Sequence, residues 1–267
     1  MNCDHETAYA LELAGAKAFR VHINSLLDGS VLLEDFHIIV LSGGFSWGDD
    51  HGAGVLQSVR LKTHMQDSFV EFVKKGNLIL GICNGFQTLV NMGLLPGFND
   101  DYQHRSIALT YNDCGNFRDQ WVSLKVNTKS PCVFTKGLAK GLAKRFECMD
   151  LPVRHGEGKF LTDEPTLRRL VSNNQIVLQY ANNNNLPANG EFPFNPNGSL
   201  LDIAGICDPS GRIFGLMPHP EAFNHWTNHP NWPFEKERLK RLGNKALKSP
   251  TSGMQLFKTA VDFIKNR

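Results

Sequence analysis

The stretch Leu78-Ile-Leu-Gly81-Ile82-Cys83-Asn84-Gly85-Phe86-Gln87-Thr-Leu-Val90 decides how this chain folds. A short apolar run leads directly into Gly-x-Cys-x-Gly, and an amphipathic helical pattern follows. A nucleophile on a strand-to-helix turn has a strained backbone, so the residues two before and two after it must be small. Gly81 and Gly85 occupy those two positions. The stretch therefore predicts a nucleophile elbow with Cys83 at its tip.

The predicted position of Cys83 favours its thiolate form. The thiol would lie at the N-terminal end of a helix, where the macrodipole stabilises negative charge. The following backbone N–H, that of Asn84, is directed to the same place and can hold an oxyanion. A second donor is expected from the glycine pair in Leu41-Ser-Gly-Gly-Phe45, with Gly44 and Phe45 as candidates. A buried structural thiol is the alternative interpretation of Cys83.

A cysteine nucleophile needs a base, and histidine has a pKa that suits proton transfer in both directions. Among the ten histidines, His219 follows the predicted strand at 212–217 and lies between two prolines. Glu221 comes two residues later, and residues i and i+2 of an extended segment project to the same side. We therefore expect Glu221 to accept a hydrogen bond from His219 and to fix its tautomer. A histidine satisfied within a turn is the alternative.

Hydrophobic patterns along the chain predict an α/β fold with a mostly parallel sheet. The expected strands are 18–23, 36–41, 77–82, 175–180, 202–207 and 212–217, and the expected helices are 7–16, 56–75 and 252–266. Between 101 and 160 the pattern alternates, which indicates antiparallel strands on one sheet edge. Residues 182–198 are expected to form a long loop. Met1-Asn-Cys-Asp4 has the character of a loop that leads into a helix, so the usual first strand is expected to be missing.

Length and composition are typical of one domain, residues 1–267, with a substantial core. A net charge of +2 argues against a nucleic-acid partner, which would require dense Lys and Arg. The six cysteines form no CxxC pair, and no apolar run approaches membrane-spanning length. We therefore expect a reduced cytoplasmic protein with no metal site and no membrane association.

Histidines and tryptophans gather between residues 225 and 232, where His225 and His229 are four residues apart. This spacing on a helix is able to bind a metal ion. Pro230 and Asn228 disfavour a helix there, so a packed or partner-facing aromatic loop is the preferred interpretation.

Seven motifs together resemble the glutaminase subunits of phosphoribosylformylglycinamidine synthase, which are class I glutamine amidotransferases of purine synthesis. The resemblance runs over nearly the whole chain. The motifs are Asn2-Cys-Asp4, Gly43-Gly-Phe-Ser-Trp-Gly-Asp49, Gly81 to Gln87, Gly93-Leu-Leu-Pro96, His155-Gly-Glu-Gly158, Asn195-Pro-Asn-Gly-Ser199 and Met217-Pro-His-Pro-Glu221.

The resemblance implies a flavodoxin-like three-layer sandwich in which Cys83 attacks the carboxamide of glutamine and Gln87 lies at the glutamine pocket. Ammonia would pass to a separate synthetase subunit that uses ATP and Mg, with a small subunit bridging the two. No cofactor is expected in this chain, which has no Walker loop. Weak activity is expected for the isolated chain.

Some features depart from the family or leave other functions open. Trp47 stands where the family usually has Tyr, and residues 182–193 and 225–232 look like additions. Stress-protease-like cysteine hydrolases carry His directly after the nucleophile, whereas this chain has Asn84. A glutaminase subunit of another synthase, or a partner-binding module that has lost catalysis, remains as an alternative function.

Overall fold

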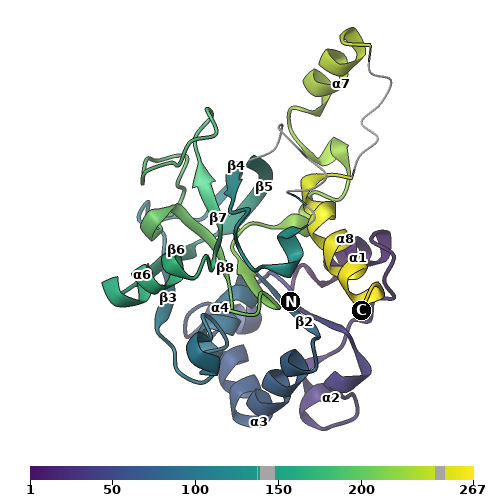
Figure 1. The fold of residues 1–267 in the computed structure, drawn as a ribbon, viewed down its shortest axis with the longest axis vertical. Coiled ribbons are helices and arrows are strands. Elements are labelled where there is room, and N and C mark those ends of the chain that lie inside the picture. The colour runs from purple at the N-terminus through teal and green to yellow at the C-terminus, as the bar shows by residue number, and fades with distance from the viewer. Residues whose placement is uncertain (137, 139–147, 244–249) are drawn as a thin grey trace.

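A computed structural model describes residues 1–136, 138, 148–243 and 250–267 and has the predicted α/β architecture (Figure 1). Seven strands form one sheet in the order β1-β2-β9-β8-β7-β4-β5. Their bounds are β1 Ile38–Leu41, β2 Leu78–Ile82, β9 Ile213–Leu216, β8 Ile203–Cys207, β7 Ile176–Ala181, β4 Arg118–Val126 and β5 Cys148–His155. β1, β2 and β9 pair in parallel, and the later neighbours pair antiparallel. Only β8 and β4 therefore run against the direction of the other five.

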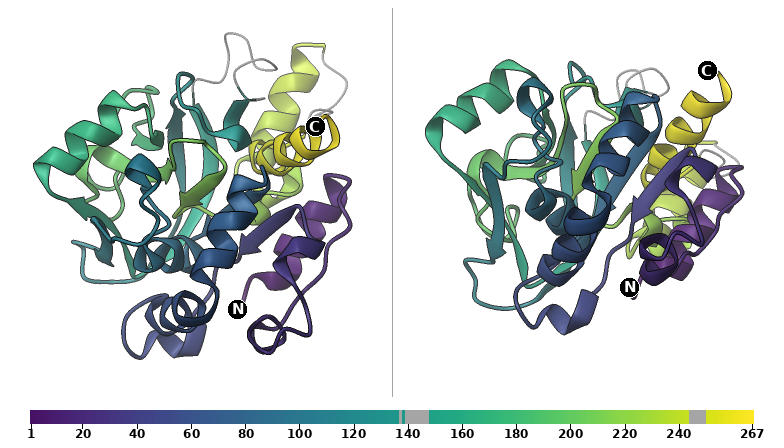
Figure 2. Two further views of the ribbon diagram at one scale, coloured as in Figure 1. Left: turned by 60° about the horizontal axis from the view of Figure 1, so that its bottom comes forward. Right: turned by 90° about the horizontal axis from the view of Figure 1, so that it is seen from below.

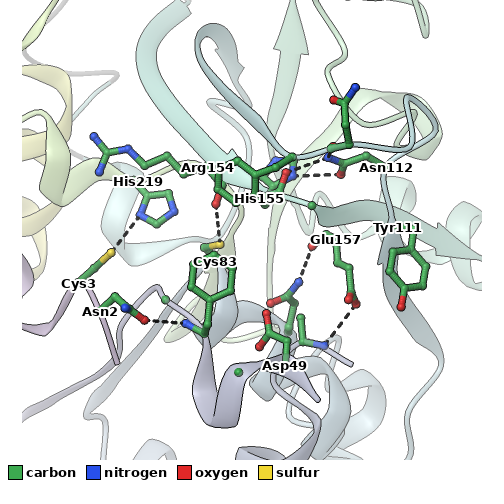
Figure 3. A pocket seen from close by; sticks show the side chains of 18 of the residues that line it. Asn2, Cys3, Asp49, Cys83, Tyr111, Asn112, Arg154, His155, Glu157 and His219 are labelled. Carbon is green, nitrogen blue, oxygen red and sulfur yellow. Dashed lines mark hydrogen bonds between the residues drawn. The ribbon is translucent and has the colours of Figure 1, made fainter. Parts of the chain in front are cut away.

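A second, two-stranded sheet supports the predicted antiparallel character of residues 101–160, of which 137 and 139–147 lie outside the described part. β3 (Ile107–Tyr111) pairs antiparallel with β6 (Glu157–Thr162). β5 ends at His155 and β6 begins at Glu157, so the chain passes from one sheet to the other at Gly156. The end of β5 lies beside the nucleophile, since the carbonyl oxygen of Arg154 is 3.6 Å from Cys83 Sγ (Figure 3).

Helices cover both faces of the large sheet (Figure 2). α3 (Val55–Lys74) and α4 (Asn84–Met92) pack against each other on one face, and α1 (Asp4–Leu13) packs with α8 (Ser252–Lys265) on the other. The predicted helices at 7–16, 56–75 and 252–266 are present with shifted ends. The other α-helices within the described ranges are α2 Ile23–Leu27, α6 Glu164–Ser172 and α7 Trp232–Arg241. Short 3-10 helices are Leu33–Asp35, Ser46–Asp49, Phe98–Asp100, Val133–Thr135, Leu200–Asp202, Pro220–Ala222 and Trp226–Asn228.

The predicted strand at 18–23 is wrong. Residues 16–22 belong to neither sheet, and α2 begins at Ile23. A strand needs a hydrogen-bonded neighbour, whereas residues 16–23 and 36–42 line a cavity of about 960 Å³. β1 is consequently the edge of the sheet, and in the described part of the chain no strand precedes it.

The long loop predicted at 182–198 is held by its own asparagines. Asn195 Oδ1 accepts hydrogen bonds from Gly198 N (2.9 Å) and Ser199 N (3.2 Å), and its Nδ2 donates to Asp202 at 2.9 Å. Asn197 Nδ2 donates to Gly158 O at 2.9 Å. Because buried amides hold it in this way, the loop braces the passage from β5 to β6.

The aromatic segment at 225–232 packs onto the body of the protein. The His229 ring lies 4.5 Å from Trp121 and 5.7 Å from Phe223 between centroids, and its Nε2 lies 3.6 Å from Asp150. Among the described residues, neither His225 nor His229 belongs to a group with metal-binding geometry. The packed aromatic interpretation is therefore favoured.

Candidate active site

The nucleophile elbow has the strained geometry that the sequence predicts. β2 ends at Ile82, α4 begins at Asn84, and Cys83 between them has φ 49° and ψ −105°. A Cβ on Gly85 would overlap with Leu41 O, and a Cβ on Gly81 would lie 2.7 Å from Gly85 O. Larger residues at either position would push the strand and helix apart, so the two glycines are what permits the turn.

Cys83 opens onto a cavity of about 620 Å³ at the carboxyl end of β2 (Figure 3). Its Sγ lies 3.6 Å from the carbonyl oxygen of Arg154, at the end of β5. Gly44, Phe45 and Gln87 line the same cavity. Cys83 is 5% exposed, so the nucleophile is largely shielded from bulk solvent.

His219 and Glu221 form a buried pair on the segment that follows β9. His219 Nδ1 lies 2.6 Å from Glu221 Oε1, and neither side chain is accessible to solvent. Burial by itself lowers the pKa of His219, but the Glu221 carboxylate and the Cys83 thiol hold that pKa well above its usual value. With Nδ1 bound to Glu221, the His219 Nε2 has no partner among the described residues and is free for proton transfer.

Cys3 lies beside this pair, and sequence reasoning assigned it no role. Its Sγ is 4.0 Å from His219 Nδ1, and its backbone N–H donates to Gly43 O at 3.2 Å. The start of the chain thus touches both the histidine and the glycine loop. Only the Asn2-Cys-Asp4 motif could have drawn attention to it.

The glycine loop contacts Asn2 closely. Gly44 has φ +132°, and a Cβ there would collide with Asn2 N. The backbone N–H of Phe45 donates to Asn2 Oδ1 at 3.0 Å. The candidate oxyanion donor Phe45 is therefore near the cavity but already has an acceptor in this conformation.

Asn84 and Gln87 at the start of α4 connect the elbow to its surroundings. The backbone N–H of Asn84 is at the first turn of the helix, and its side-chain Nδ2 donates to Asp49 Oδ1 at 3.0 Å. Gln87 Nε2 donates to the carbonyl oxygen of Glu157. Both side chains hold loops around the cavity, and Gln87 lines it. Its contact with glutamine, which the family resemblance implies, stays a prediction.

The carboxylates of Asp49 and Glu157 line the cavity (Figure 3). The sequence did not predict that these two side chains lie at the site. Burial, and then the nearby charge of Glu157, raise the pKa of Asp49 to about 6. Glu157 Oε2 accepts a hydrogen bond from Ala53 N at 3.3 Å. Their spacing in the sequence is more than 100 residues, so no local pattern could have paired them.

Within the described ranges, one group has the spacing of metal ligands, namely Cys3, His219 and Glu221, with ligand atoms within 4.8 Å of one another. The 2.6 Å contact between His219 and Glu221 already joins two of these three. The arrangement suits proton transfer at the cysteine, and the expectation of a chain without a metal remains a prediction.

Of the helices in the described ranges, none is sufficiently long and apolar to cross a membrane.

Comparisons with known proteins identify the family of this chain. The family model described as CobB/CobQ-like glutamine amidotransferase domain matches residues 1–264. Phosphoribosylformylglycinamidine synthase subunit PurQ of Methanococcus maripaludis is 44% identical over 98% of this chain and 93% of its own length. The PurQ subunit of Dehalococcoides mccartyi is 43% identical over 97% of this chain and 92% of its own length.

Among solved structures, a chain in the structure of PurLQS from Thermotoga maritima superposes with a TM-score of 0.68 at 27% identity, covering 98% of this chain and 93% of that chain. The matches extend over the elbow at Cys83, over His219 and over both sheets, so no large part of the described fold falls outside them. This chain therefore belongs to the CobB/CobQ-like glutamine amidotransferase family and, within it, groups with the PurQ subunits of phosphoribosylformylglycinamidine synthase.

Proposed function

We propose that this chain is the glutaminase subunit of phosphoribosylformylglycinamidine synthase, acting as one catalytic domain in the cytoplasm. The observation that supports this most is the buried contact of 2.6 Å between His219 and Glu221, beside a cysteine held on a strained elbow. A buried carboxylate that orients a histidine next to a nucleophile is the arrangement that acyl transfer requires.

In this proposal, Cys83 thiolate attacks the carboxamide carbon of glutamine and the carbonyl oxygen becomes an oxyanion. The N–H of Asn84 stabilises that charge, and a donor from Gly44 or Phe45 supplements it. His219, protonated on Nε2, gives its proton to the departing nitrogen, and ammonia leaves. The remaining thioester is hydrolysed by water, which loses its proton to His219 as glutamate is released.

Ammonia that escapes into solvent is lost to the reaction that follows, so the proposal includes direct transfer of ammonia to a synthetase subunit. That partner would use ATP and Mg to convert formylglycinamide ribonucleotide to its amidine, and a small subunit would bridge the two. The likeness to a chain in the PurLQS structure supports an assembly of this kind. This chain itself would need no cofactor.

A chloroketone analogue of glutamine tests the nucleophile directly. The analogue should alkylate Cys83 alone among the six cysteines, and excess glutamine should protect it. Peptide mass spectrometry identifies the labelled residue. Cys114, which is partly exposed, is the internal control for nonspecific alkylation, and preferential labelling of Cys114 would contradict the proposal.

A further inference from the structure

His155 is a buried histidine beside the nucleophile that the proposed reaction does not use. It ends β5, is 3% exposed and lines the same cavity as Cys83. Figure 3 places it between Cys83 and Asn112. Its Nε2 is buried and has no hydrogen-bond partner among the described residues. A buried polar atom without a partner destabilises a protein, so such atoms in an active site are candidates for binding a ligand.

The contacts of Asn112 determine which ring nitrogen of His155 carries the proton. Asn112 Nδ2 donates to Asn116 O at 3.0 Å and to His155 O at 2.8 Å, which uses both amide hydrogens. Asn112 Oδ1 must then be an acceptor, and it accepts a hydrogen bond from the backbone N–H of Gly158 at 3.1 Å. The same Oδ1 lies 3.1 Å from His155 Nδ1, so Nδ1 is the protonated nitrogen. Nε2 is therefore left with a lone pair.

Burial keeps this imidazole neutral. It lowers the pKa of His155 to about 3, and the positive charge of nearby His219 acts in the same direction. At neutral pH, Nε2 can accept a hydrogen bond but cannot donate one.

The ring is also held in one place. A Cβ on Gly158 would lie 2.5 Å from both Cε1 and Nδ1 of His155, so only glycine leaves room for the imidazole. Asn197 fixes this glycine by its hydrogen bond to Gly158 O. Residues of the His155-Gly-Glu-Gly158 and Asn195-Pro-Asn-Gly-Ser199 motifs thus hold the His155 ring rigidly, with Nε2 able only to accept a hydrogen bond.

We propose that His155 determines specificity by accepting a hydrogen bond at Nε2 from the amide NH2 of the glutamine side chain. This inference rests on the proposed glutaminase function and adds to it. A neutral acceptor favours an amide, which donates, over an ester or a carboxylate, neither of which can donate. The same discrimination helps the product glutamate to leave.

Two substitutions separate the acceptor from the structural role of the ring. In His155→Asn the side-chain Nδ2 replaces Nδ1 as donor to Asn112, but nothing replaces Nε2. In His155→Gln the side-chain Oε1 reaches the Nε2 position and keeps an acceptor there. The readout is the ratio of kcat/KM for glutamine to kcat/KM for the γ-methyl ester of glutamate, measured with the synthetase partner present.

We expect His155→Asn to lower this ratio about tenfold and His155→Gln to restore most of it, since one hydrogen bond to a buried group is worth about that factor. Equal ratios in both variants and in the wild type would overturn the inference. So would an equal fall in both variants. If wild type released no ammonia from glutamine at all, the proposed function would fail first, and the two failures are thereby distinguished.

A binding measurement covers the case in which the variants do not fold. In Cys83→Ala, which cannot turn over, glutamine should shift the ¹⁵N resonance of His155 Nε2, and glutamate should not. Absence of a shift with saturating glutamine would overturn the inference without recourse to a His155 variant.

Discussion

The side-chain oxygen of Asn2 accepts a hydrogen bond of 3.0 Å from the backbone N–H of Phe45. These residues lie 43 positions apart, and their contact engages a donor proposed for the oxyanion hole. A donor that points at Asn2 is not available to a transition state. The structure thus gives a physical reason for the weak activity expected of the isolated chain.

Replacing Asn2 by Ala should release the Phe45 N–H. We expect glutaminase kcat without the partner to rise roughly tenfold, because an oxyanion donor is worth about 10²–10³ in rate when fully aligned and a freed loop aligns only part of the time. Ammonia release measured on the isolated chain checks this. Asn24→Ala, an exposed asparagine elsewhere, is the matched control. A fall in rate would mean that Asn2 supports the loop instead of restraining it.

Substituting Glu221 by Gln should lower the pKa of His219, because the carboxylate is a main reason that this pKa is raised. The catalytic rate should fall by roughly 10²-fold or more, as when a histidine loses the group that orients it. The pH dependence of kcat/KM and NMR titration of the imidazole measure the two effects. An unchanged His219 titration would contradict this assignment.

The same pair should make stability depend on pH. A histidine whose pKa is raised on folding contributes stability that is fully present below its unfolded value of 6.5 and is lost as pH rises through the raised pKa. Wild type should therefore exceed Glu221→Gln in Tm at neutral pH, and the difference should shrink in alkaline solution. A difference that grew with pH would contradict this sign.

Replacing Asp49 by Asn should stabilise the protein at neutral pH. The pKa of Asp49 is raised to about 6, so its charge opposes folding above that pH, and this penalty is absent below 3.8. Asn also tolerates the positive φ of 57° at this position. We expect Tm to rise about 2 °C at pH 7 and not at pH 4.

Thermal unfolding across this pH range tests that expectation, with the exposed Asp67→Asn as its control. A rise of equal size at pH 4 and pH 7 would show that the charge of Asp49 is not responsible.

Adding one methyl group at Gly85 should destabilise the fold far more than at Gly156. The Gly85 Cβ would overlap with Leu41 O, whereas the nearest atom to a Gly156 Cβ is Phe117 Cδ2 at 3.9 Å. Neither glycine has a positive φ, so the comparison isolates packing. We expect a loss of about 3 kcal/mol for Gly85→Ala and little for Gly156→Ala in denaturant unfolding. A loss for Gly85→Ala as small as that for Gly156→Ala would indicate that the elbow tolerates larger residues.

Local patterns were enough to predict the elbow and the late histidine. The strand, the two glycines and the helix around Cys83 follow each other without interruption, and Glu221 is only two residues from His219. The prediction of a strand at 18–23 was wrong because its outcome depends on a distant segment. An apolar alternation forms a strand only when another strand lies beside it.

The remaining parts of the site depend on contacts between distant segments. The charge of Glu157 raises the pKa of Asp49, and the tautomer of His155 is set by Asn112, 43 residues earlier in the chain. No window of sequence contains both members of either pair. Their roles became visible only once the sheets placed the loops around Cys83.

Ammonia release from glutamine, with and without the synthetase partner, its ribonucleotide substrate and ATP, tests the central claim most directly. The wild-type chain should release ammonia in a partner-dependent manner, and Cys83→Ala should abolish the release while keeping the wild-type Tm. Release that persists in Cys83→Ala would contradict the assignment of the nucleophile, and no release from wild type under any of these conditions would contradict the proposed function itself.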